Sequence, residues 1–352
     1  MRRLSLFLLL ICLLVSLLPA LAQESTSEAA PEPDATAEAT AAPEATDEPE
    51  AAPDAESTAE AEAADEARQN RVQFPGSGSY NVREDFGTQQ REFAIDIPSS
   101  YSDDGDPMPL VFALHGAGGS GNGIRSYSGF PELGEEVGFI SVFPSGLGGG
   151  WNDGRPDPGL AVIDDIGYFE HVITLLTNSL NIDESRIYTT GHSMGGMMSF
   201  RLGCNLPQYF AAIASVASTM PRYIQAECDA APALPVLVIQ GTDDYVVPWV
   251  GIRNGYLSAP DTMAYWAEHN GCTYEPEFVV EPDTHPDDGT LVIREQYDDC
   301  DHEVMMYGIY QGGHTWPGRA ITAGFDLGGT SYDISAAEVI WAFFERQALD
   351  AG

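Results

Sequence analysis

The sequence predicts an α/β protein in which helices cover both faces of a mostly parallel central sheet. Apolar runs rich in β-branched residues alternate with segments of helical periodicity, an order typical of a parallel sheet wrapped by helices. Several of these runs are continuously apolar, as expected of strands that are buried on both faces. The predicted strands are residues 93–97, 110–114, 139–143, 186–190, 211–216, 236–239 and 304–310.

Helices are predicted between and after these runs. Residues 165–180 place their large apolar side chains on one stripe, a second helix runs through Arg201, and residues 261–269 form a third. Near the end of the chain, Ser335 and Glu338 make a capping box ahead of an apolar run, which predicts the start of a last helix. In a sheet of this kind, loops that carry function lie at the carboxyl ends of the strands.

The N-terminal part of the chain has a different character. Residues 1–22 combine two arginines, an apolar run and a small-x-small ending, which predicts a secretory signal peptide that is cleaved before Gln23. Residues 23–69 are mostly Ala, Pro, Thr, Ser and acidic residues, and they predict a disordered acidic stalk, with a glycosylated stalk as the open alternative. Residues 70–352 are then expected to form one folded α/β domain.

Charge and cysteine usage limit the partners and cofactors. The chain has 15 basic and 54 acidic residues and a net charge of −39, so nucleic acid and anionic membranes are poor partners. A monomer is expected. The four cysteines beyond the signal peptide allow three disulfide pairings, of which we expect Cys204 with Cys228 and Cys272 with Cys300. Their spacing is not that of a zinc site, and no metal is expected.

The stretch Gly191-His192-Ser193-Met194-Gly195 lies between a predicted strand and a predicted helix. Small residues on both sides of the serine permit a strained turn that lifts the Ser193 hydroxyl above the sheet. The Met194 amide then begins the helix, where it can stabilise an oxyanion. An ordinary glycine turn is the alternative, so the interpretation of Ser193 as a nucleophile depends on its partners.

A nucleophilic serine requires a histidine base and an acid, which follow the strand-turn-helix serine in the order acid, then histidine. The strand at 236–239 leads into Asp243 and Asp244, and the pattern leaves open which of the two is the acid. His314 follows a strand and occupies a glycine-bounded loop. The other histidines beyond these aspartates lie in a predicted helix or in polar loops: His269, His285 and His302.

A second oxyanion donor is expected in His115-Gly116-Ala117-Gly118-Gly119, the glycine loop after the strand at 110–114. We assign this role to the Ala117 amide, together with the Met194 amide. His115 is expected to hold the loop in place and not to act as a second base.

With these motifs in view, residues 91–344 resemble the secreted α/β-hydrolase esterases that include feruloyl esterases, acetylxylan esterases and polyhydroxybutyrate depolymerases, a group similar to carbohydrate esterase family one. The resemblance rests on motifs at residues 113–119, 151–154, 164–167, 191–204, 241–249 and 312–318. It implies the α/β-hydrolase fold, two cysteine pairs and Asp244 as the acid, because the acid of the family lies two residues before Val-Val-Pro. A serine mechanism of this kind needs no metal or organic cofactor. The chain departs from the family at Gln240 and Gln311, which bears on substrate preference.

The sequence therefore predicts an extracellular serine esterase that acts through an acyl-enzyme on feruloyl (hydroxycinnamoyl) or acetyl esters of plant polysaccharide. Trp151, Trp249 and Trp316 lie on or beside the expected site loops, where they either bind substrate or serve packing. A polyhydroxybutyrate or other polyester depolymerase is one alternative, and a serine peptidase is another. From a different class comes a non-catalytic binding protein on a hydrolase fold.

Overall fold

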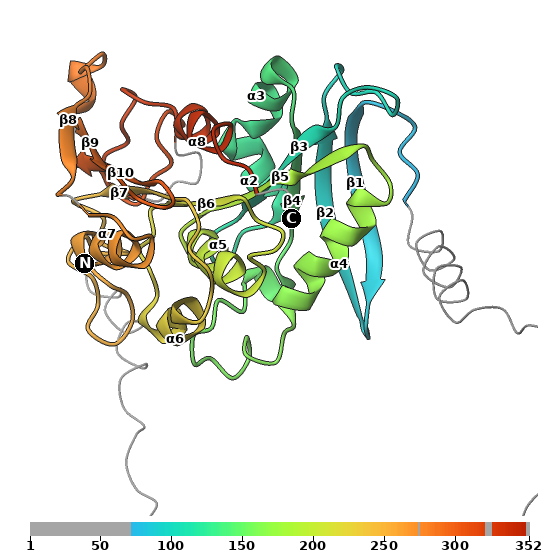
Figure 1. Cartoon of the computed structure of the whole chain (residues 1–352), viewed down its shortest axis with the longest axis horizontal. Helices are drawn as coiled ribbons and strands as arrows, with labels where there is room; N and C mark the ends of the chain where they lie inside the picture. The colour runs from blue at the N-terminus through green and yellow to red at the C-terminus, as the bar shows by residue number, and fades with distance from the viewer. Residues whose placement is uncertain (1–71, 274, 321–325, 350–352) are drawn as a thin grey trace, which may run out of the picture. The chain divides into compact units, whose positions relative to one another are not determined.

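The computed structural model describes residues 72–273, 275–320 and 326–349 (Figure 1). The predicted signal peptide, residues 1–22, and the predicted stalk, residues 23–69, lie outside the described residues. Where the structure describes the chain, no helix is long and apolar enough to cross a membrane.

The described residues form one ten-stranded sheet with the order β1-β2-β4-β3-β5-β6-β7-β10-β9-β8 (Figure 1). Six neighbouring strands from β4 to β10 are parallel, whereas β1 and β2 at one edge and β8 and β9 at the other pair antiparallel. The strands are β1 (Gly78–Phe86), β2 (Gln89–Ile97), β3 (Met108–Leu114), β4 (Ile140–Pro144), β5 (Ile182–His192), β6 (Ala212–Val216), β7 (Val236–Gly241), β8 (Glu277–Val280), β9 (Leu291–Tyr297) and β10 (Val304–Tyr310).

The central strands are the ones that the sequence predicted, and they are buried on both faces. Every residue of β4, β6 and β7 is buried, which explains their uninterrupted apolar sequences. Three strands, β1, β8 and β9, were not predicted from the sequence. β1 and β8 are the two outermost strands, and β9 lies between β8 and β10. All three carry polar or exposed residues at many positions, so their apolar signal is weak.

Helices cover both faces of the sheet (Figure 1). On one face α2, α3 and α8 pack over a cluster that includes Phe130, Phe139 and Phe343, and on the other α4, α5, α6 and α7 cover the remaining core. Ser335 caps α8 by accepting a hydrogen bond from the Glu338 amide, as predicted. The helices are α2 (Gly121–Ser128), α3 (Phe130–Val137), α4 (Asp165–Thr177), α5 (Met194–Asn205), α6 (Gln225–Asp229), α7 (Ala259–His269) and α8 (Ala336–Phe344).

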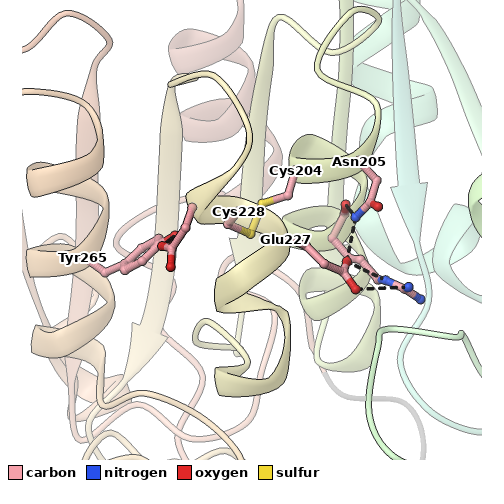
Figure 2. Close-up of a disulfide and its surroundings, with 7 residues drawn as sticks. Cys204, Asn205, Glu227, Cys228 and Tyr265 are labelled. Carbon is pink, nitrogen blue, oxygen red and sulfur yellow. Dashed lines mark hydrogen bonds and ion pairs between the residues drawn. A yellow bond between two sulfur atoms is a disulfide. The ribbon is translucent and has the colours of Figure 1, made fainter. Parts of the chain in front are cut away.

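Two disulfides join neighbouring segments and match the expected pairs. Cys204 at the end of α5 is bonded to Cys228 in α6 (Figure 2), and Cys272 after α7 is bonded to Cys300 before β10. Beside the first disulfide, Glu227 accepts hydrogen bonds from Arg201 and Asn205 (Figure 2). The disulfides close sequence separations of 24 and 28 residues, for which the chain-entropy model gives about 3.5 kcal/mol of stabilisation each.

Candidate active site

Ser193 occupies a strained turn between the end of β5 and the start of α5. Its backbone has φ 56° and ψ −120°, a conformation that is costly for a residue with a side chain and that occurs at functional sites. The flanking glycines allow it. A Cβ atom added to Gly191 would lie 2.4 Å from the Gly195 carbonyl carbon, and one added to Gly195 would lie 2.3 Å from the Leu114 oxygen. The Ser193 amide also donates to the Val216 oxygen at 2.8 Å, which ties the turn to β6.

Asp244 and His314 meet at the carboxyl ends of β7 and β10. His314 Nδ1 lies 2.8 Å from Asp244 Oδ2, and both side chains are almost completely buried. The other carboxylate oxygen, Oδ1, accepts hydrogen bonds from the Val246 and Val247 amides, each at 2.8 Å. Two backbone donors and one imidazole therefore fix the orientation of this carboxylate. Asp243, the alternative acid, is exposed.

Among the described residues, the other candidate histidines and His115 form no hydrogen bond with Asp244. His285 and His302 are exposed, and His269 stacks on Tyr265 within α7. His115 Nε2 accepts a hydrogen bond from the Gly146 amide at 2.9 Å, so its ring holds the loop after β4 against the loop after β3. Burial lowers the pKa of His115, and the neutral ring that results is the form with an acceptor nitrogen.

His192, for which no role was predicted from the sequence, links the serine turn to His314. Its ring centroid lies 4.9 Å from that of His314, and its other ring neighbours are Tyr127 and Trp316. Burial first, and the nearby His314 second, lower the pKa of His192 to about 3. A neutral ring therefore packs beside His314 near neutral pH, and it adds no second positive charge when His314 takes up a proton.

The glycine loop after β3 lies against the serine turn. A Cβ atom added to Gly116 would be 3.3 Å from the Ser193 Cβ atom. The Gly118 amide donates to the Gly149 oxygen at 2.7 Å, and the Gly119 amide donates to the Gly116 oxygen at 3.0 Å. These bonds fold the loop around Ala117. Met194 begins α5, and the first amides of a helix have no acceptor within the helix.

The structure corrects the expectation for two of the three tryptophans. Trp151 and Trp316 are fully buried, and their indole N–H groups donate to the backbone oxygens of His115 at 2.9 Å and Ser128 at 3.1 Å. Neither ring has a free face for a substrate, because the core covers both. Trp249 is half-buried and lines a hollow beside β10.

The two departures from the family pattern have structural roles. Gln240 Nε2 donates to Asp244 Oδ2 at 3.2 Å and to the Val247 oxygen at 2.9 Å, so this buried amide holds the acid and its loop. Gln311 has a positive φ of 58°, which glycine adopts more readily. Its backbone N–H donates to Thr242 Oγ1 at 2.9 Å. Both glutamines thus act on the loops that carry Asp244 and His314, a role beyond the substrate preference that the sequence predicts for them.

A buried ion pair explains two further motifs. Asp165 accepts from Arg91 at 2.6 Å through one carboxylate oxygen and from the Asn152 amide at 2.7 Å through the other. Burial raises the pKa of Asp165 although Arg91 opposes the shift. The motifs at 151–154 and 164–167 therefore meet around one buried carboxylate, and removing either charge would leave the other unpaired in the interior.

Comparisons with known proteins agree with this architecture. A family model described as alpha/beta hydrolase fold matches residues 109–233. An acetyl xylan esterase from Aspergillus awamori superposes with a TM-score of 0.51 at 20% identity, covering 68% of this chain and 94% of that chain. A thermostable esterase superposes with a TM-score of 0.52 at 18% identity, covering 78% of this chain and 63% of that chain. The chain has the α/β-hydrolase fold.

Proteins of similar sequence include feruloyl esterases. Feruloyl esterase C of Emericella nidulans is 26% identical over 261 residues, which cover 72% of this chain and 83% of that protein. Feruloyl esterase B of Piromyces equi is 31% identical over 201 residues, or 53% of this chain and 37% of that protein. A protein named as an esterase in Nocardia uniformis subsp. tsuyamanensis is 30% identical over 232 residues. The match covers 60% of this chain and 66% of that protein.

The chain spans less than two thirds of the Piromyces and Nocardia proteins. The resemblance to the feruloyl esterase group is confirmed. These relatives support the prediction of a carboxylic ester hydrolase.

Proposed function

We propose that this protein is an extracellular serine esterase that acts through an acyl-enzyme on feruloyl or acetyl esters of plant polysaccharide. The observation that carries the proposal is the buried hydrogen bond between His314 and Asp244. It lies at the carboxyl ends of the parallel strands, where the strained Ser193 turn also ends β5. The two disulfides support an extracellular location of the protein, because disulfides persist in oxidising surroundings.

In the proposed mechanism, His314 Nε2 takes the Ser193 hydroxyl proton while the oxygen attacks the ester carbonyl. The Ala117 and Met194 amides donate to the oxyanion of the tetrahedral intermediate, a contribution of about 3 to 4 kcal/mol for one such donor. The protonated His314 then gives its proton to the alcohol oxygen as the ester C–O bond breaks. The alcohol departs, and the acyl group remains bound to Ser193 as the acyl-enzyme. In the second half of the reaction, His314 takes a proton from water, whose oxygen attacks the acyl carbonyl. His314 then returns the proton to Ser193 Oγ as the bond to the acyl group breaks, which releases the carboxylic acid. Asp244 holds His314 in the tautomer with a proton on Nδ1 throughout.

The test is hydrolysis of methyl ferulate, acetylated xylan, p-nitrophenyl butyrate and hydroxybutyrate oligomers by the wild type and by Ser193→Ala. Loss of the nucleophile should lower kcat about a million-fold. Ser126→Ala is the matched control, because Ser126 is exposed in α2 and its hydroxyl donates only to the Asn122 oxygen. An organophosphonate should label the wild type and Ser126→Ala but not Ser193→Ala. Near-native turnover by Ser193→Ala would refute the mechanism.

A polyester depolymerase is the second candidate, and it is favoured by exposed apolar residues on the loop that carries Asp244. Tyr245 is 62% exposed and Val250 is 80% exposed, and such residues can contact an apolar polymer surface. Within the same panel, a preference for hydroxybutyrate oligomers over methyl ferulate and acetylated xylan would select this candidate.

A further inference from the structure

A small apolar hollow lies on the sheet between β10, β9 and β8, next to the loop that follows β7. Its volume is about 180 Å³, and its walls are Thr242, Trp249, Phe278, Ile293, Glu295, Met306, Gly308 and Tyr310. That volume is smaller than the 300 Å³ or so at which pockets for drug-sized ligands begin. The hollow can therefore hold one compact chemical group and not a polymer segment.

Strand register builds the floor of the hollow. Glu295 lies opposite Phe278 on β8 and opposite Met306 on β10, so these three side chains form one row on the same face of the sheet. Trp249 closes one side. A Cβ atom added to Gly308 would lie 3.1 Å from Trp249 Cη2, so the glycine lets the indole rest directly on the strand.

Aromatic side chains form the rim. Phe278 is 63% exposed and Tyr310 is 54% exposed, and with Trp249 they supply three aromatic rings around the opening. The faces of aromatic rings carry negative charge density, which attracts organic cations.

Glu295 is the one acidic side chain among the walls. It is only 8% exposed, and burial raises its pKa, with a hydrogen bond from the Tyr297 hydroxyl as the opposing influence. The neighbouring Arg294 pairs with Glu281 at 2.8 Å instead. Among the described residues, Glu295 thus has a phenol partner but no ion-pair partner, and a desolvated carboxylate of this kind is stabilised by a cation.

We propose that this hollow binds a small organic cation with a quaternary ammonium or methylated ammonium head group, held between the three aromatic rings and the Glu295 carboxylate. The net charge of −39 also favours the approach of cations. A metal ion fits poorly, because hard cations such as Ca²⁺ and Mg²⁺ require several oxygen ligands, and the walls hold a single carboxylate. In the described part of the chain, no group of three or more His, Cys, Asp or Glu side chains is arranged to hold a metal.

Isothermal titration with choline chloride tests the site in the full-length protein at constant ionic strength. The matched neutral ligand is 3,3-dimethylbutan-1-ol, which has the shape of choline with carbon in place of the charged nitrogen. We expect saturable binding of choline and at least about tenfold weaker binding of the neutral alcohol, because the alcohol loses both the aromatic-face and the carboxylate attraction.

Two variants and one control separate this site from general charge attraction. Glu295→Gln should weaken choline binding about tenfold, and Phe278→Ala, which removes an exposed ring with little effect on the core, about threefold. Glu277→Gln is the control, because Glu277 is an exposed carboxylate on the same strand as Phe278 and lies outside the hollow. It should bind choline like the wild type.

The proposal is overturned if choline does not saturate the wild type, or if the neutral alcohol binds as tightly as choline, which would indicate a site for neutral apolar groups. It is also overturned if Glu277→Gln weakens binding as much as Glu295→Gln, or if both Glu295→Gln and Phe278→Ala bind like the wild type. Because the readout is binding, these outcomes do not depend on whether the esterase mechanism is correct.

Discussion

Replacement of Asp244 by asparagine tests the proposed acid through its hydrogen bonds. Asp244 Oδ2 faces two donors, His314 Nδ1–H at 2.8 Å and Gln240 Nε2 at 3.2 Å, and Oδ1 faces the Val246 and Val247 amides at 2.8 Å. An asparagine has one acceptor oxygen and one NH₂ group. In either orientation its NH₂ group therefore meets two N–H donors.

If the NH₂ group faces His314, the imidazole can accept this hydrogen bond only through an unprotonated Nδ1 atom. The proton then moves to Nε2, which can no longer act as the base for Ser193. The loss of this tautomer in a serine triad lowers kcat about 10⁴-fold. If the NH₂ group faces the two backbone amides instead, both lose their acceptor, and the loss at the buried Val247 amide costs about 1 to 3 kcal/mol in unfolding free energy. The Val246 amide is only partly buried, so its loss costs less.

The assay is steady-state hydrolysis of p-nitrophenyl butyrate, with urea unfolding to measure stability. Asp243→Asn is the matched control, because Asp243 is exposed and, among the described residues, its carboxylate accepts a hydrogen bond from Thr242 Oγ1 alone, at 3.1 Å. We expect Asp243→Asn to stay within about threefold of the wild-type kcat, because an asparagine side-chain oxygen can still accept the hydrogen bond from Thr242. The reasoning is refuted if Asp244→Asn keeps near-native kcat, or if Asp243→Asn loses as much as Asp244→Asn.

Two further predictions concern stability. The folded-state pKa of His192 is about 3, below the ordinary value of 6.5, so the unfolded chain binds more protons between these values, and stability is present above pH 6.5 and lost as pH falls. Between pH 7 and pH 4.5 the wild type should therefore lose roughly 2.5 kcal/mol more unfolding free energy than His192→Gln in denaturant titrations, and equal losses would contradict the assigned burial. The double variant Cys204→Ala/Cys228→Ala should lose about 3.5 kcal/mol, measured by urea unfolding against the wild type with and without reductant. A loss below about 1 kcal/mol would show that the bridge constrains the unfolded chain less than its 24-residue separation implies.

The sequence predicted the central strands well because burial on both faces leaves a continuous apolar run. It missed α2 and α3, the segments GNGIRSYS and FPELGEEV, because glycine and proline weaken the helical signal. In the structure, Ser120 caps α2 by accepting from the Gly123 amide at 3.2 Å. Gly129 ends α2 with a positive φ of 83°. Such short helices depend on packing against the sheet more than on their own propensity.

The site residues were predictable to different degrees. The turn around Ser193 and the loop of His314 have glycines that close contacts require, and glycines are visible in a sequence. Two adjacent aspartates, in contrast, look alike in a sequence. What distinguishes Asp244 is the pair of amides from Val246 and Val247 that folds back onto its carboxylate. Only the family pattern could favour it in advance.

Trp151 and Trp316 are buried, so substrate specificity depends on other residues. Trp151 links the loop after β4 to the His115 oxygen, and Trp316 links the loop of His314 to the Ser128 oxygen. Their indoles therefore hold the proposed catalytic loops in place. Exposed apolar side chains on the loops after β4 and β7 include Val162, Tyr245 and Val250. Exposed loop residues are not constrained by packing, so substrate choice can change there without disturbing the buried hydrogen bonds that orient Asp244 and His314.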